Sequence, residues 1–291
     1  MFEKLLVTTD LSDASQNIMK CLNQLKTLGA KEASLVHIID VIDVGGLYGT
    51  FTKLLKPKME SLREMIEGMG YKTNIIIDLG NPAREINRIA TEGNFSVIVA
   101  GTHGESLLKD VLLGSVVHKI IISAKKPILL IPLNILAEES SERCKALCGE
   151  MLKNILFPTD FSDTAENAFL YLKYLVENSK ADISLCHIQD KKRIEPYLKD
   201  KLEEFNKIDL ERLSRLEGDL KSAGARSVEK IIDFGNPAKL ITELANSGKY
   251  TMLVIGSQGR SFMGETFLGK VANYAVHHID IPLLIVPPKY F

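Results

Sequence analysis

The stretch LLVTTDLSD at residues 5–13 returns as ILFPTDFSD at residues 155–163, with the same order of apolar and polar positions. Four further blocks repeat in the same order along the chain. LVHIID at residues 35–40 matches LCHIQD at residues 185–190, and IDLGNPA at residues 77–83 matches IDFGNPA at residues 232–238. The second copy therefore holds a short insertion between these two blocks. A chance match does not keep five blocks in order, so the chain consists of two copies of one unit.

Each copy alternates short apolar runs with segments of helical spacing. In the first copy we expect strands at residues 5–7, 33–39, 73–78, 96–100 and 128–131, and helices at residues 15–28, about 54–68, 82–92 and 115–123. Asn81 is a good N-cap, and Pro82 at the first helical position costs no hydrogen bond. Alternating strands and helices favour an α/β fold with a parallel sheet between helices. We expect one domain at residues 1–136, a polar linker at residues 137–150 and a second domain at residues 151–291.

The composition excludes several classes of function. A formal net charge of -1 leaves no basic excess for binding a nucleic-acid backbone. No apolar run approaches the roughly 18 residues of a membrane-spanning helix, and the N-terminal apolar run is too short for a signal peptide. We therefore expect a cytoplasmic protein that binds neither nucleic acid nor membranes. In such a protein the 4 cysteines are not expected to form disulfides.

A glycine pattern follows the fourth predicted strand of the first copy. Gly101 and Gly104 come directly after the strand, and Gly114 and Ser115 open the next helix. Glycines let backbone N–H groups approach an anion, and a helix start adds free N–H donors and a favourable dipole end. The pattern therefore predicts a phosphate site, although a tight turn followed by a serine cap would give the same residues.

Asp10 follows the first predicted strand and lies at the same edge of the predicted sheet. Its carboxylate is suited to accept a ribose hydroxyl or to help hold a divalent ion. It is equally suited to cap the helix that follows, in competition with Ser12. Both readings stay open at the level of sequence.

The combined pattern resembles the universal stress protein family, in its ATP-binding branch and in tandem form. The family's phosphate signature, G-x2-G-x9-G-[ST], is met at residues 101–115, and LVHIID and KKPILLIP also look like the family. The resemblance implies two Rossmann-like domains of the adenine nucleotide α-hydrolase type, each with a five-stranded parallel sheet and helices on both faces. It also implies binding of ATP or AMP, often with Mg²⁺ or Mn²⁺.

By this resemblance Asp10 lies at the ribose and the backbone of Ile38 lies at the adenine. The nucleotide-binding residues that the resemblance implies for the first copy are Thr8, Thr9, Asp10, Ile38, Gly101, Gly104, Gly114 and Ser115. The protein is not expected to hold a metal ion by itself, and Asp10 is the candidate to help hold one together with the nucleotide.

The second copy departs from the family signature at one position. Lys270 stands where the signature has a serine or threonine, so the site is either weakened or holds a phosphate through the ammonium charge. The residues of this candidate second site are Pro158, Thr159, Asp160, Ile188, Gly256, Gly259, Gly269 and Lys270.

Three functions fit the sequence. The resemblance and the lack of a catalytic constellation favour a nucleotide-dependent stress-response regulator. A slow ATP hydrolase using His103, which the second copy replaces by Gln258, is the first alternative, and a ligand-free interaction scaffold is the second. His37 and His187 recur in both copies without a nucleophile or metal ligand beside them, and we interpret them as structural.

The last predicted strands, ILLIP and LLIVP, are apolar edge segments. Exposed apolar edges invite aggregation. We therefore expect the two copies to pair through these strands as an internal pseudo-dimer, and two chains are able to associate further as a homodimer.

Overall fold

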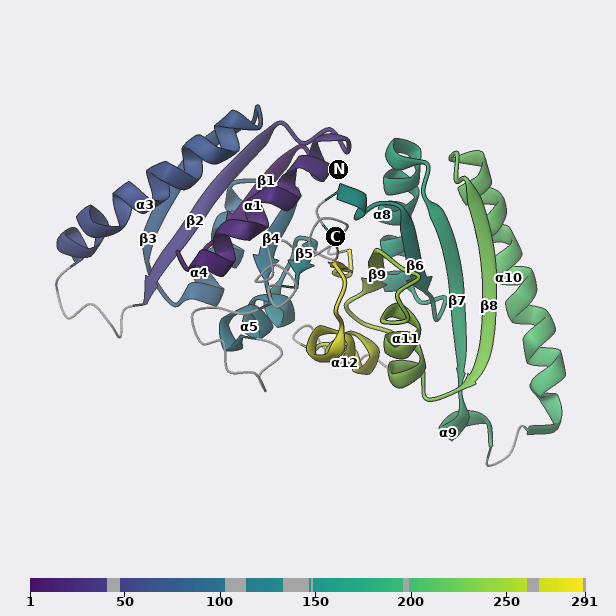
Figure 1. The fold of residues 1–291 in the computed structure, drawn as a ribbon. Helices are drawn as coiled ribbons and strands as arrows, with labels where there is room; N and C mark the ends of the chain where they lie inside the picture. Colours follow the sequence, from purple (N-terminus) through teal and green to yellow (C-terminus); the bar gives the residue numbers. More distant parts are fainter. Residues whose placement is uncertain are drawn as a thin grey trace. The chain divides into compact units, whose positions relative to one another are not determined.

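Alternating strands and helices form both halves of the chain in the computed structural model, which describes residues 1–40, 48–102, 114–132, 147, 149–195, 199–260 and 267–289. The chain divides into two units, Met1–Gly149 and Glu150–Phe291. Figure 1 shows the same succession of elements in each.

The first unit is built around five parallel strands. They are β1 (Lys4–Thr8), β2 (Glu32–Asp40), β3 (Lys72–Gly80), β4 (Val97–Gly101) and β5 (Ile128–Ile131), and they lie in the order β3-β2-β1-β4-β5. The helices are α1 (Asp13–Lys26), α3 (Tyr48–Gly68), α4 (Pro82–Glu92) and α5 (Ser115–Ser123). Helix α1 packs beside α3, and α4 packs beside α5, so two pairs of helices cover the sheet.

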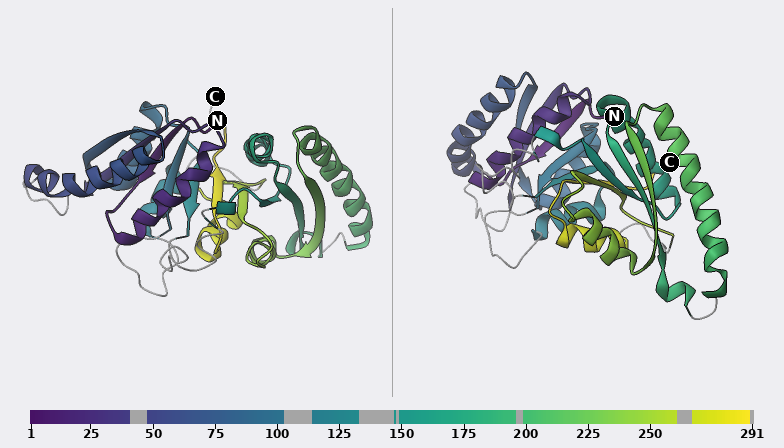
Figure 2. Two further views of the ribbon diagram at one scale, coloured as in Figure 1. Left: turned by 45° about the horizontal axis from the view of Figure 1, so that its top comes forward. Right: turned by 45° about the vertical axis from the view of Figure 1, so that its right-hand side comes forward.

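The second unit repeats this arrangement. Its strands are β6 (Asn154–Pro158), β7 (Asp182–Asp190), β8 (Ser227–Gly235), β9 (Met252–Gly256) and β10 (Leu283–Val286), in the order β8-β7-β6-β9-β10 and all parallel. Its main helices are α8 (Asp163–Ser179), α10 (Leu202–Ser222), α11 (Pro237–Ala245) and α12 (Lys270–His278). The short helices α9 (Lys191–Ile194) and η1 (Lys199–Lys201) lie between β7 and β8, where the sequence places the insertion. Figure 2 shows α10 running along β7 and β8 from two further directions.

The predicted core is confirmed at the positions that the helical spacing selects. Ile18, Leu22, Leu25 and Leu28 are all at most 1% exposed, and every residue of β4 and β5 is buried. A positive φ of 79° at Gly29 lets the chain turn after α1. The expected α/β fold with a parallel sheet in each copy is therefore correct.

Two local expectations are wrong. Helix α3 begins at Tyr48 rather than near residue 54, and it continues past Pro57. Proline removes one backbone hydrogen bond from the helix, but because Pro57 is exposed, water can bond the carbonyl that is left without its donor. Cys21 is disulfide-bonded, whereas Cys186 is free and buried. Residue spacing does not show which cysteines the fold brings within bonding distance.

Candidate functional site

The carboxyl ends of the central strands bring the predicted site residues of the first unit to one edge of its sheet. Thr8 ends β1, Ile38 lies near the end of β2 and Gly101 ends β4, and β1 pairs with both β2 and β4. Ser115 is the first residue of α5. Gly104 and His103 lie outside the described residues.

The turn after β1 is fixed by its own polar groups. The Thr9 hydroxyl oxygen accepts a hydrogen bond from the Leu11 N–H at 3.0 Å, and Leu11 has a left-handed φ of 64°. The carbonyl of Thr9 lies 2.9 Å from Nδ1 of His37 on β2. His37 therefore ties β1 to β2, which supports its structural interpretation.

Asp10 presents one bonded and one unbonded carboxylate oxygen. Its Oδ1 accepts hydrogen bonds from the Ser12 N–H at 3.1 Å and from the Ser12 hydroxyl at 2.7 Å. Its Oδ2 is buried and has no hydrogen-bond partner in the described part of the chain. The carboxylate thus stabilises the turn with one oxygen, and the other is an acceptor that lacks a donor, which costs free energy unless a ligand supplies one.

The start of α5 supplies donors on the phosphate side. Gly114 is the N-cap and forms no side-chain capping bond, and its own N–H donates to the Thr102 carbonyl at 2.8 Å. The first N–H groups of a helix have no partner within it, and Ser115 is exposed at this end. The backbone N–H groups and the Ser115 hydroxyl are therefore donors of the kind that suit an anion.

Helix α4 holds α5 in this position. The Asn87 amide donates to the Ile120 carbonyl at 3.0 Å and to the Ser123 hydroxyl at 2.8 Å, both on α5. At the start of α4 the Asn81 side chain accepts from the Arg84 N–H at 3.2 Å, as the capping pattern predicts.

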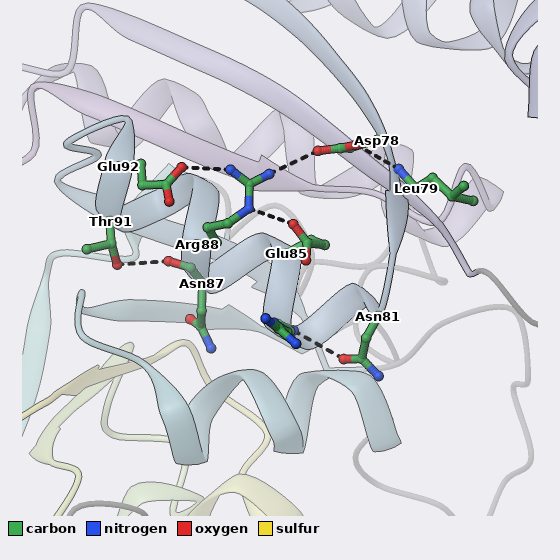
Figure 3. A network of polar contacts seen from close by, with 9 residues as sticks. Asp78, Leu79, Asn81, Glu85, Asn87, Arg88, Thr91 and Glu92 are labelled. Carbon is green, nitrogen blue, oxygen red and sulfur yellow. Dashed lines mark hydrogen bonds and ion pairs between the residues drawn. The ribbon is translucent and has the colours of Figure 1, made fainter.

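An ion-pair network ties α4 to β3. Figure 3 shows the Arg88 guanidinium among three carboxylates, two on α4 and one on β3. The nitrogen–oxygen distances are 2.6 Å to Glu85, 2.7 Å to Glu92 and 3.1 Å to Asp78. The guanidinium therefore links α4 to β3, and α4 is the helix whose Asn87 contacts α5.

The second unit reproduces the turn after its first strand. The Thr159 hydroxyl accepts from the Phe161 N–H at 2.9 Å, Phe161 has a left-handed φ of 58°, and Nδ1 of His187 lies 2.7 Å from the Thr159 carbonyl. Pro158 ends β6 and Ile188 lies in β7. The nucleoside side of the candidate second site is therefore built like that of the first.

The four residues predicted for the phosphate side of the second unit all lie in the described part of the chain. Gly256 ends β9, Gly269 is the N-cap of α12 and Lys270 is its exposed first residue. The Asp160 Oδ1 accepts from Ser162, as in the first unit, but its Oδ2 accepts the Arg260 N–H at 2.8 Å. Both oxygens of this carboxylate are bonded within the protein.

A buried polar cluster on β7 and α10 escaped prediction. Nε2 of His187 lies 3.4 Å from Oδ2 of Asp209, and the Gln189 amide donates to the same oxygen at 3.0 Å. The first unit has Ile39 and Leu55 at the corresponding places in the strand and the helix. A glutamine among the apolar residues of β7 is the one sequence signal that could have indicated this cluster.

Metal and membrane features are not found in the part of the chain that the structure describes. No group of three or more His, Cys, Asp or Glu side chains among these residues is arranged to hold a metal ion. No described helix is long and apolar enough to cross a membrane.

The strand order in the two units, with helices between successive strands, defines a tandem Rossmann-like α/β protein. The family model of the universal stress protein family matches residues 1–132 and 151–287. The chain belongs to the universal stress protein family, with one family domain in each unit.

Individual relatives agree with this assignment. Universal stress protein MJ0577 of Methanocaldococcus jannaschii is 32% identical over 154 residues, which span 45% of this chain and 95% of that protein. Universal stress protein YxiE of Bacillus subtilis is 30% identical over 147 residues, spanning 45% and 99%. The crystal structure of a universal stress protein from Archaeoglobus fulgidus has the same fold, with a TM-score of 0.78 at 22% identity over 99% of this chain and 100% of that chain.

Proposed function

We propose that the first unit binds an adenine nucleotide, ATP or AMP, and that the protein acts as a nucleotide-dependent regulator in a stress response. The observation that carries the proposal is the buried Oδ2 of Asp10, which has no hydrogen-bond partner in the described part of the chain and lies at the sheet edge where α5 begins. A ribose hydroxyl would supply the missing donor, and the N–H groups at the start of α5 would receive the phosphates.

The proposal assigns roles by the family pattern. Thr8 and Thr9 line the nucleoside, the backbone of Ile38 contacts the adenine, and Gly101 and Gly104 surround the phosphates. A Mg²⁺ or Mn²⁺ ion would enter with the nucleotide, and the unbonded Asp10 oxygen is the protein atom suited to contact it.

The proposed organisation follows the sequence repeat. We take residues 137–150 as a linker between two family domains, and the apolar last strands of the two domains as their mutual contact. A cytoplasmic location fits a nucleotide ligand, since adenine nucleotides are abundant there.

The first test identifies whatever small molecule the purified protein carries, before any particular nucleotide is added. Small molecules released by denaturing the purified protein are identified by mass spectrometry, and ATP and AMP are then titrated into the stripped protein by calorimetry. We expect an adenine nucleotide to be released and to rebind. If millimolar ATP and AMP produce neither heat nor a rise in melting temperature, the nucleotide proposal fails and the ligand-free scaffold remains.

Two variants locate the site. Asp10→Ala should weaken binding roughly 10- to 100-fold, because it removes a charged acceptor, and Ser115→Ala roughly 2- to 10-fold, because it removes a neutral donor. Ser61→Ala, on the exposed side of α3, is the matched control and should bind as the unchanged protein does. Following ADP formation during the same titration separates a regulator from a slow hydrolase.

A further inference from the structure

The two carboxylates at the ribose position differ in what occupies their second oxygen. Asp10 Oδ2 is buried and has no hydrogen-bond partner among the residues that the structure describes, whereas Asp160 Oδ2 accepts the Arg260 N–H at 2.8 Å. The remaining contacts of the two carboxylates are the same, since Ser12 and Ser162 each donate from the backbone and the hydroxyl to Oδ1. The difference therefore lies in one acceptor atom.

The Arg260 N–H reaches Asp160 because a glycine precedes it. A Cβ on Gly259 would lie 2.6 Å from Oδ2 of Asp160, so a larger residue there would force the loop or the Asp160 side chain to move. The glycine loop of the second unit thus packs directly on the carboxylate that a ribose would need.

Further contacts hold the loop in this place. The Gln258 side chain is 7% exposed and donates to the Phe267 carbonyl at 3.2 Å. The Gly269 N–H donates to the Ser257 carbonyl at 2.8 Å, which ties the loop to the start of α12. The Arg260 guanidinium lies 5.9 Å from the centre of the Phe161 ring, within the range of a cation–π contact.

A second guanidinium covers the same ring. The Arg212 guanidinium on α10 lies 5.2 Å from the centre of the Phe161 ring, and the His187 ring packs against Phe161 at 4.9 Å. Arg212 is in turn 3.6 Å from Asp209. Phe161 is therefore held between β7, α10 and the glycine loop, beside the carboxylate that the loop occupies.

We propose that the second unit is closed to nucleotides by its own glycine loop, through the Asp160–Arg260 contact, and that this contact, not Lys270, limits the chain to one bound nucleotide. The inference rests on the proposed function of the first unit. A ribose entering the second unit meets a carboxylate oxygen that already accepts the Arg260 N–H and against which the backbone of the loop packs. Lys270 is exposed at the phosphate side and does not contribute to that contact.

The stoichiometry of nucleotide binding tests the proposal. Calorimetry with ATP should give one nucleotide per chain for the unchanged protein and for Lys270→Ser, which restores the family signature. Asp10→Ala in the first unit should weaken this binding roughly 10- to 100-fold. Arg260→Pro removes the N–H donor together with the guanidinium, and combined with Lys270→Ser it should raise the stoichiometry to two.

Arg260→Ala is the matched control for the proline variant. It removes the guanidinium and keeps the backbone donor, so combined with Lys270→Ser it should stay at one nucleotide per chain. The proposal is overturned if the unchanged protein binds two nucleotides, or if Lys270→Ser alone adds the second.

Hydrogen exchange tests the contact without any nucleotide. In the stripped protein the Arg260 amide should exchange at least 10-fold more slowly than in an unstructured chain, and Asp160→Ala should remove that protection. Asp10→Ala should leave it unchanged. Exchange of the Arg260 amide at the unstructured rate would refute the closed loop, even if ATP binds nowhere in the protein and the proposed function fails separately.

Discussion

Replacing Asp10 and Asp160 with alanine should change the free energy of unfolding of the two units by different amounts. In the first unit, Asp10→Ala removes a buried oxygen that has no partner among the described residues, which relieves a desolvation cost of about 1–3 kcal/mol. It also removes the two hydrogen bonds from Ser12, together worth about 1–2 kcal/mol. These terms nearly cancel, so the free energy of unfolding should stay within about 1 kcal/mol or rise.

In the second unit no such compensation exists. Asp160→Ala removes two hydrogen bonds from Ser162 and one from Arg260, and it leaves the Arg260 N–H without its acceptor. Valued as in the first unit, the two bonds from Ser162 are together worth about 1–2 kcal/mol and the bond from Arg260 adds about 0.5–1.5 kcal/mol, so we expect a loss of about 1.5–3.5 kcal/mol.

The two variants are compared by urea titration. Because the chain has no tryptophan, circular dichroism follows unfolding, and hydrogen exchange of peptides from each unit assigns the change. Asp219→Ala on the exposed face of α10 is the control and should shift the free energy of unfolding by less than about 0.5 kcal/mol. Equal losses in Asp10→Ala and Asp160→Ala would refute the reasoning, because the unbonded oxygen would then carry no cost.

Three further outcomes follow from single groups. The hydrogen bond from Arg226 lowers the pKa of Asp182 to about 2 from its usual 3.8, so the stabilisation by this pair is complete above about pH 4 and is lost as the pH falls through 2. NMR titration of the carboxyl carbon should find this pKa, and Arg226→Ala should return it toward 3.8; an unchanged value would contradict the assignment. Burial, with a smaller effect from the charge of Asp233, raises the pKa of the Cys186 thiol to about 12. Iodoacetamide at pH 8 should therefore modify this thiol in urea and not in the native protein, and mass spectrometry would detect the modification. Arg88→Met should lower the melting temperature, and the decrease should be smaller in 1 M NaCl because salt screens exposed ion pairs. Glu243→Met, at the matching place on α11, is the control and should not lower the melting temperature in this salt-dependent way. A decrease that does not depend on salt would point to lost packing instead.

The fold followed from short-range patterns in the sequence. The apolar spacing of Ile18, Leu22 and Leu25 selects the buried face of α1, and all three are at most 1% exposed. Asn81 and Pro82 fix the start of α4 at the predicted residue. These signals were readable because each depends on neighbours within one or two turns of the same element.

The contacts that distinguish the two units join residues far apart in the chain. Asp160 and Arg260 are 100 positions apart, and Gln189 and Asp209 are 20 apart on different elements. A hydrogen bond of this kind depends on the packing of whole elements, which no local pattern encodes. The cluster around Asp209 also replaces an apolar pair, so propensity alone would not select it.

The difference that the sequence displayed most clearly, Ser115 against Lys270, lies at exposed first residues of α5 and α12. A side chain at this position can strengthen or weaken the binding of a phosphate, but the backbone N–H groups at the start of the helix are present in both units. The Asp160–Arg260 contact differs in kind, because a backbone N–H is common to every residue but proline and leaves no mark in the sequence. Gly259 permits the close approach, and Gly104 holds the same place in the first copy, so glycine alone does not separate the units either. In the second unit the glycine loop rests on Asp160, and under the proposed closure this contact, rather than the side chain at residue 270, keeps a nucleotide out.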